Sequence, residues 1–417
     1  MAETHKPFRE LIKPHSNFEF IEKRHKWALI SVLAIVVCIA SLFVNKSVRG
    51  DFLNWTIDFK GGTEMIFAFE DSEGNPSPID AAVIRTTLKD AGKSGFTVSN
   101  FAWTTEVDGK EVQAAGLMVR TPEFGAVSSA DQKKIAKAFH ESFKDVGVLK
   151  TSWSGDRLFV RASGPVEFSR AKEFFSGQNQ TLREWSKRDI TEFSVPAKGT
   201  EEYNIQFSLR GLDAQYQELL STSLGAGVVI KIQNVYGVGA RAGKKLRNDG
   251  IKSLFYVMAL IMVYLAFRFD IRYAPGAVIA LLHDAILVVG VFAITWQEVS
   301  LTTVAALLTV IGYSVNDSVV IFDRIRENVI RIKDKKFARI INISLNETMA
   351  RTLLTSITLF VVTLMMNILG TGLVRNFAFA MNIGVIVGVY SSIFVASPVA
   401  LAIHNKWYSS PPKSSDS

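Results

Sequence analysis

The sequence predicts a polytopic α-helical membrane protein with six transmembrane helices and a large external α+β domain built on the ferredoxin-like βαββαβ pattern. Three observations predict this class. Of the 417 residues, 48% are hydrophobic and only 21% are charged. The hydrophobic residues form blocks long enough to cross a bilayer, which takes about 20 apolar residues. The first two blocks are separated by a long segment in which strand and helix patterns alternate.

Six apolar blocks are candidates for transmembrane helices. The first is not a cleaved signal peptide, because no small-x-small cleavage site precedes Asn45. The second and the fifth are short for a span. The last five form a membrane region over residues 251–403. The expected spans are residues 27–44, 251–267, 273–294, 299–322, 353–369 and 377–403.

The positive charge of the chain is a topology signal. Lysine and arginine exceed aspartate and glutamate by 47 − 39 = 8, and they concentrate before the first span and between the fourth and fifth. In the short loops on the other side, Arg375 is the only basic residue. By the positive-inside rule, the terminal segments 1–26 and 404–417 are cytoplasmic and the domain 45–249 is periplasmic. No aromatic residues interleave the basic ones, so we expect the lipid bilayer and no nucleic acid as a partner.

The external domain alternates strands and helices over about 200 residues. The order predicts two βαββαβ units near residues 55–153 and 154–237, either as two successive folds or as one fold that carries an inserted copy. A hairpin turn is expected at Asp108-Gly109, and one strand of the second unit at residues 189–193. The single cysteine, Cys38, excludes a fold stabilised by disulfides.

Motifs for nucleotide, metal or covalent chemistry are weak. Residues 237–242 match a dinucleotide fingerprint and residues 243–245 look like a phosphate loop, but the glycine spacing is wrong and a membrane span follows. His140 has no second histidine at helical spacing, so no zinc site is expected. The sequence predicts no catalytic residues, metal or cofactor, and hence no enzyme.

An acidic residue inside the fourth span has a different significance. Asp317 lies six residues inside the cytoplasmic end at Asp323, about 9 Å deep by helical rise. A carboxylate there costs about 2.5–3.5 kcal/mol on insertion scales. Ser314 and Ser318 flank it on the same helix face and could hold water. We favour a proton carrier; the alternative is a neutral, hydrogen-bonded acid that joins helices.

Two further polar positions have two explanations each. His283 and Asp284 lie near the membrane midplane, about 16–18 Å from Arg272 by helical rise. They serve either as structural polar support or as part of a relay. Arg351 follows Glu347 by four residues at the start of the fifth span, so an ordinary i,i+4 ion pair explains it as well as a functional role does.

Several motifs together resemble one family. Asp58, Gly61 and Gly62 stand in Asp-Phe-Lys-Gly-Gly-Thr, which resembles the Asp-Phe-x-Gly-Gly-Thr signature after the first span of the SecF branch of the SecD/SecF family. This family belongs to the resistance-nodulation-division superfamily. The chain departs from the pattern in its larger external segment and in Lys60, where a small residue is commoner. Further motifs of the same branch resemble residues 281–284, 311–317, 323–328 and 351–356.

The resemblance implies an accessory of bacterial protein export in the inner membrane. Such proteins pair with a SecD-like subunit, act at the SecYEG channel and use the proton-motive force to move unfolded preproteins. Asp317 matches the proton-relay aspartate of the family and Arg351 its partner arginine; we add the neighbouring Asn316 to this relay. Asp284, His283, Ser314 and Ser318 would then be intramembrane polar support. Asp58, Gly61 and Gly62 would be a structural signature at the domain root.

Two other functions fit some of these features. A proton-coupled exporter of small molecules or lipids also uses intramembrane acids, but such pumps usually carry twelve spans and two external domains in one chain. The second alternative is a non-conducting scaffold of the Sec channel, in which Asp317 only joins helices.

Overall fold

The computed structural model describes residues 18–74, 76–107, 110–183, 202–225, 227–268, 273–332 and 336–407. It divides into two compact units. The membrane unit runs to Thr56 and resumes at Arg247, and the outer unit is Ile57–Leu246. The expected strand at 189–193 and the expected turn at Asp108-Gly109 lie outside the described residues.

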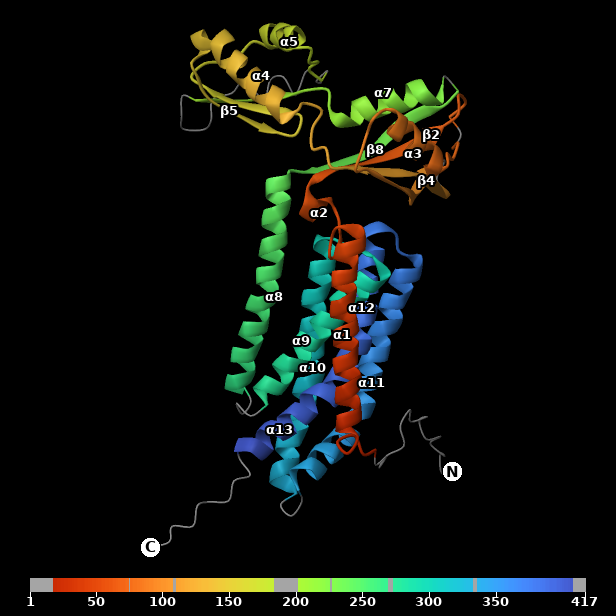
Figure 1. Ribbon diagram of the computed structural model, residues 1–417, viewed down its shortest axis with the longest axis vertical. Coiled ribbons are helices and arrows are strands. Elements are labelled where there is room, and N and C mark those ends of the chain that lie inside the picture. Colours follow the sequence, from red (N-terminus) through yellow and green to blue (C-terminus); the bar gives the residue numbers. More distant parts are fainter. Residues whose placement is uncertain are drawn as a thin grey trace, which may run out of the picture. The chain divides into compact units, whose positions relative to one another are not determined.

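Six helices in the described part of the chain are long and apolar enough to cross a membrane, and this number agrees with the number of apolar blocks in the sequence (Figure 1). The last of them is interrupted by one π-helical turn, η2, a feature that often marks functional positions in helices. The helices are α1 (Arg24–Arg49), α8 (Ala240–Arg268), α9 (Ala274–Thr295), α10 (Leu301–Arg331), α11 (Phe337–Leu369) and α12 (Gly372–Ser391), which continues through η2 (Ser392–Ala396) into α13 (Ser397–Trp407).

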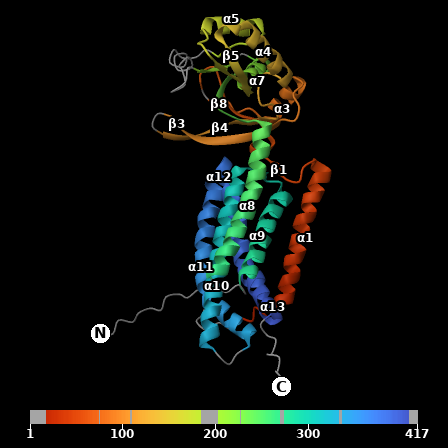
Figure 2. The same cartoon turned by 90° about the vertical axis from the view of Figure 1, so that its left-hand side faces the viewer.

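The membrane unit is organised around α9, α10 and α12, the most buried of these helices. Small and branched side chains of α9, α10 and η2, such as Ala277, Ile311 and Ala396, belong to one core, against which Val389 and Tyr390 of α12 pack. α1 packs along α9 at the edge of the bundle (Figure 2). A short parallel pair of strands, β1 (Asn54–Trp55) and β9 (Glu298–Val299), joins the end of α1 to the start of α10.

The first sheet of the outer unit has the strand order β3-β4-β2-β8, and neighbouring strands are antiparallel. With α3 and α7 this is the order of a βαββαβ ferredoxin-like unit. Phe67 on β2, Ile84 on α3 and Tyr216 on α7 meet in its core. The elements are β2 (Gly62–Glu70), α3 (Ala81–Asp90), β3 (Thr97–Val107), β4 (Lys110–Thr121), α7 (Leu212–Leu224) and β8 (Val229–Val238).

The second sheet is inserted between β4 and α7. It has the order β5-β6-β7, is antiparallel, and has its own core around Phe139, Phe175 and Phe207. Because β8, which follows the second sheet in the sequence, pairs with β2, the first sheet is not complete before residue 153. The two sheets are therefore not two successive folds. The pairing matches one fold that carries an insertion. The elements of the insert are α4 (Ser129–Ser142), η1 (Lys144–Val146), β5 (Val148–Ser154), β6 (Arg157–Ala162), α5 (Phe168–Gly177) and β7 (Tyr203–Ser208).

Candidate functional site: polar groups in the membrane unit

Asp317 is a buried acid with few partners. It lies on α10 and is 2% exposed. The Ser356 hydroxyl on α11 lies 3.5 Å from Oδ2 as its donor, longer than the roughly 2.5–3.0 Å of an ordinary O–H···O hydrogen bond. The same hydroxyl lies 3.1 Å from the Tyr313 hydroxyl. A carboxylate offers about four acceptor positions. Asp317 therefore has capacity left for a proton, a water molecule or a cationic partner.

The other residues expected in the relay do not touch this acid. Asn316 and Arg351 are exposed in the described structure, and no hydrogen bond or ion pair given for its residues joins either one to Asp317. Ser318 is buried beside Asp317 on α10. Glu347 forms ion pairs with Arg324 and Arg331, and none with Arg351 is found among the described residues.

Asp284 is the centre of a second buried cluster, which is better satisfied. Its Oδ2 accepts hydrogen bonds from Ser314 on α10 at 2.6 Å and from Ser391 on α12 at 2.8 Å. Its Oδ1 lies 3.1 Å from Nδ1 of His283, the preceding residue on α9. The cluster thus joins three helices of the core. Ser314 belongs to this cluster, and among the described residues no hydrogen bond links it to Asp317.

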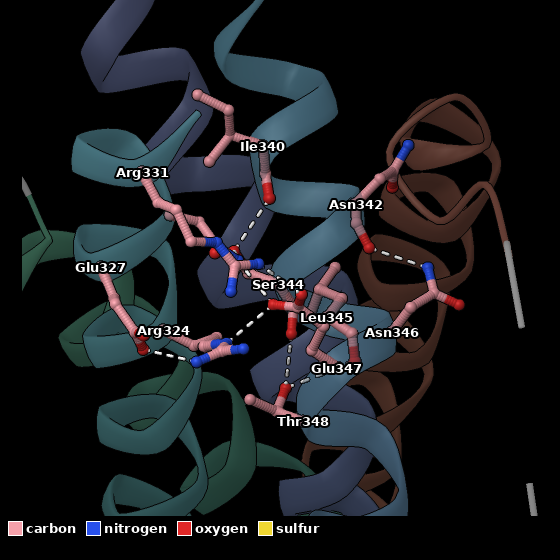
Figure 3. Close-up of polar contacts among 11 residues, drawn as sticks. Arg324, Glu327, Arg331, Ile340, Asn342, Ser344, Leu345, Asn346, Glu347 and Thr348 are labelled. Carbon is pink, nitrogen blue, oxygen red and sulfur yellow. Dashed lines mark hydrogen bonds and ion pairs between the residues drawn. The ribbon is translucent and has the colours of Figure 1, made fainter. Parts of the chain in front are cut away.

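A third polar group joins the ends of α10 and α11 that carry the basic loop, and sequence reasoning missed it (Figure 3). Glu347 Oε2 accepts from Arg324 Nε and from Asn328 Nδ2, both at 2.7 Å, and Oε1 accepts from Arg331 Nη2 at 2.9 Å. Arg324 also pairs with Glu327 at 2.5 Å. The sequence does contain a signal for this group, because Arg324, Asn328 and Arg331 recur at helical spacing on one face of α10.

The same end of α11 holds the segment before α1. The Asn346 side chain accepts from the backbone N–H of Phe18 at 2.9 Å and donates to its carbonyl oxygen at 2.9 Å. The Asn342 side chain accepts from the Ile21 N–H at 3.1 Å. Figure 3 shows both asparagines on α11. Ile21 is buried in the core of the membrane unit, so this segment is part of the fold.

Comparisons with known proteins agree with this architecture. Residues 220–406 match the family model described as protein export membrane protein SecD/SecF, C-terminal. The chain is 29% identical to the protein translocase subunit SecF of Koribacter versatilis over 398 residues, which are 94% of this chain and 93% of the relative. The chain belongs to the SecD/SecF family. Members of this family are transport subunits and not enzymes.

Other members of the family match over shorter ranges. SecF of Helicobacter pylori strain 26695 is 46% identical over 166 residues, which are 40% of this chain and 51% of the relative. SecDF of Thermus thermophilus is 31% identical over 297 residues, which are 71% of this chain and 38% of the relative. The crystal structure of SecDF from that organism superimposes with a TM-score of 0.55 at 24% identity, covering 94% of this chain and 39% of that chain, and so shares its fold.

The family signature after α1 has a structural explanation. Gly61 and Gly62 have φ angles of +81° and +125°, which favour glycine. A Cβ on Gly61 would overlap the backbone of Ala240, and one on Gly62 would overlap the carbonyl oxygen of Thr121. The two glycines therefore let the chain pass from the short helix α2 (Ile57–Lys60) into β2 in close contact with the backbone of Ala240 and Thr121. Asp58 is buried within α2.

Proposed function

We propose that the chain is an accessory subunit of the Sec protein-export machinery. In this proposal it uses the proton-motive force, together with a SecD-like partner, to promote the translocation and release of unfolded preproteins that emerge from the SecYEG channel. Its family membership and the name of its relatives, protein translocase subunit SecF, support this role. The matched residues span 38% of the SecDF relative, and this supports a SecD-like partner subunit.

The proposed location is the bacterial inner membrane. Segments 1–26 and 404–417 are cytoplasmic, and the domain 45–249 is periplasmic. The basic residues near the Glu347 group support this orientation, because lysine and arginine concentrate on the cytoplasmic side of membrane proteins. The exposed apolar face of α8, with Phe255, Tyr256 and Phe267, supports a lipid or helical neighbour there.

Asp317 is the proposed proton carrier, and its surroundings are the observation that supports this most. A buried acid is usually satisfied by its neighbours, whereas among the described residues Asp317 has one long hydrogen bond. Arg351 is the proposed cationic partner of the Asp317 carboxylate after proton release, and Asn316 the proposed neighbour in the relay. Both would have to approach it in another state of the cycle. Asp284, His283, Ser314 and Ser318 are proposed as the polar support around this path.

The energy available is of the right order. One charge that crosses 100 mV is worth about 2.3 kcal/mol. Moving a two-state element from 1:99 to 99:1 takes about 5.5 kcal/mol. One proton at that voltage therefore biases a conformational equilibrium, and two protons, or one proton with a pH gradient, nearly switch it.

The test is late-stage preprotein translocation into inverted membrane vesicles with and without a proton gradient. Asp317→Asn keeps the size of the side chain and removes the titrating group. The matched control is Asp323→Asn, because Asp323 is an exposed acid on the same helix. At matched expression, we expect Asp317→Asn to lose the gradient-dependent part and the control to keep it. An unchanged gradient dependence in Asp317→Asn would favour the scaffold function instead.

A further inference from the structure

The Asp284 cluster contains an unusual buried group. His283 is 4% exposed, and its Nε2 has no hydrogen-bond partner among the residues that the structure describes. The ring stacks on Tyr390 of α12, with centroids 5.9 Å apart and an interplanar angle of 25°. A buried polar atom without a partner is unfavourable. Asn328 Oδ1 is also such an atom among the described residues, but unlike an amide oxygen, the imidazole Nε2 can take up a proton.

The hydrogen bonds of Asp284 indicate its ionised form. The hydroxyls of Ser314 and Ser391 both donate to Oδ2, and His283 Nδ1 faces Oδ1. With a proton on Nδ1 of His283, three donors surround a side chain that is 0% exposed, and this arrangement fits an acceptor-only carboxylate. A buried carboxylate is stable only beside a compensating charge.

His283 is the group that can supply this charge. Tyr390 on α12 contacts the pair, and the helices α10 and α1, which also pack against α9, carry the buried titratable groups Asp317 and Cys38. None of these three can become positive. Tyr390 is occupied, because its hydroxyl donates to the Trp27 carbonyl oxygen and lies 2.8 Å from Ser31 Oγ.

We propose that His283 and Asp284 form a second proton-binding site in the membrane core. The imidazole Nε2 takes a proton from a hydronium ion, so that an N–H bond forms as an O–H bond breaks, while Nδ1–H donates to the Asp284 carboxylate. The two serines hold the carboxylate in place through this change. The transport role of this proton rests on the proposed proton-driven function, whereas the site itself does not. Such a site would supply the second of the two protons that nearly switch a two-state element at about 100 mV.

The site is tested by ¹⁵N nuclear magnetic resonance of the full chain in lipid nanodiscs, with labelled histidine, between pH 5 and pH 9. The chain has 6 histidines, and the His283 signal is assigned by its loss in His283→Asn. Asparagine keeps a donor toward Asp284 and lacks Nε2. The control is His25→Asn, which removes an exposed histidine of α1. If His283→Asn does not fold, the signals of the other histidines are assigned by substitution and His283 by elimination.

We expect His283 to pass between singly and doubly protonated forms within this range. Asp284→Asn should move that transition about 1–3 pH units lower, because a nearby opposite charge favours the charged form. Asp317→Asn should leave the transition in place. A His283 signal that stays in one neutral tautomer across the range would overturn the proposal. Loss of gradient-dependent export in Asp317→Asn with a non-titrating His283 would keep the proposed function and reject only the second site.

Discussion

Two acids on neighbouring helices of the membrane unit have opposite surroundings. Glu347, on α11 at the basic end of the bundle, receives hydrogen bonds from two arginines and one asparagine at 2.7–2.9 Å. Asp317, on α10 deeper in the bundle, is more buried and has one hydrogen bond of 3.5 Å. Paired carboxylates are held in the ionised form by their partners. A buried and weakly paired carboxylate is free to gain or lose a proton.

This difference indicates that the two regions have different roles. The Glu347 group fixes α10 against α11, and with Asn342 and Asn346 it also fixes the segment before α1. The Asp317 region lies between the same two helices, where Ser356 is its only recorded partner in the described structure. The Glu347 group therefore holds one end of the helix pair together. A change of charge at Asp317 would act on the other part of the pair, which lacks such contacts in the described structure.

The largest expected effect on stability comes from disrupting the Glu347 group. Glu347→Ala leaves Arg324, Arg331 and Asn328 without their shared acceptor, and we expect a loss of about 2–3 kcal/mol. The measurement is thermal unfolding of the detergent-solubilised chain. The control is Glu327→Ala, because Glu327 is 57% exposed at its side chain and is recorded with Arg324 alone. Equal losses in both variants would contradict this role of the Glu347 group.

The next largest effect on stability is expected at Asp156 in the outer unit, an acid whose hydrogen bonds in the described structure are with backbone groups instead of side chains. Its carboxylate accepts from the backbone N–H groups of Ala126 and Leu212, which precede and follow the insert in the sequence. Asp156→Ala leaves both donors without a partner, and we expect a loss of about 1–2 kcal/mol. Faster proteolysis of the insert during a temperature ramp would report it. Wild-type resistance of this variant would show that the insert is held by its other contacts.

The same residue predicts a dependence on pH. Burial raises the pKa of Asp156 above its ordinary 3.8, although its backbone hydrogen bonds and Arg183 lower it. An acid with a raised folded-state pKa binds its proton more tightly when folded. Its contribution to stability is therefore greatest at low pH and is lost as the pH rises from 3.8 through the raised value. Wild type measured relative to Asp156→Asn should lose stability over this window; a constant difference would reject the argument.

The smallest effect is expected beside Asp317. Ser356→Ala removes a weak hydrogen bond to the acid and a contact of the Tyr313 hydroxyl, so the loss should be under about 1 kcal/mol. Thermal unfolding of the solubilised chain measures it, with Ser344→Ala as the comparison, since Ser344 accepts from the buried Asn328. A loss from Ser356→Ala larger than that from Glu347→Ala would reverse the contrast between the two regions.

Local patterns predicted the membrane helices and the candidate acids. A run of apolar residues and an aspartate inside it are visible in the sequence without knowledge of any neighbour, so the six helices and Asp317 were expected. The insertion in the outer unit was not resolved, because the pairing of β2 with β8 joins Gly62 to Val238 across the whole domain. No local pattern distinguishes this pairing from two successive folds.

The partners of polar side chains were the least predictable. Arg324 and Arg331 look like topology signals in the sequence, and only the register of α10 against α11 brings them to Glu347. Spacing suggested that Glu347 would pair with Arg351, yet the contacts across the helix pair prevailed. Ser314 shares a face with Asp317 in a helical projection but donates to Asp284 on another helix. Contacts between helices depend on packing that a single sequence does not encode locally.

We propose that Asp317, and not Glu347, changes protonation. Infrared difference spectroscopy of the protein in lipid vesicles after a pH jump measures the carboxyl band directly. We predict a pH-dependent band in wild type that Asp317→Asn removes and Glu347→Gln leaves in place. A band that survives Asp317→Asn and disappears in Glu347→Gln would contradict it.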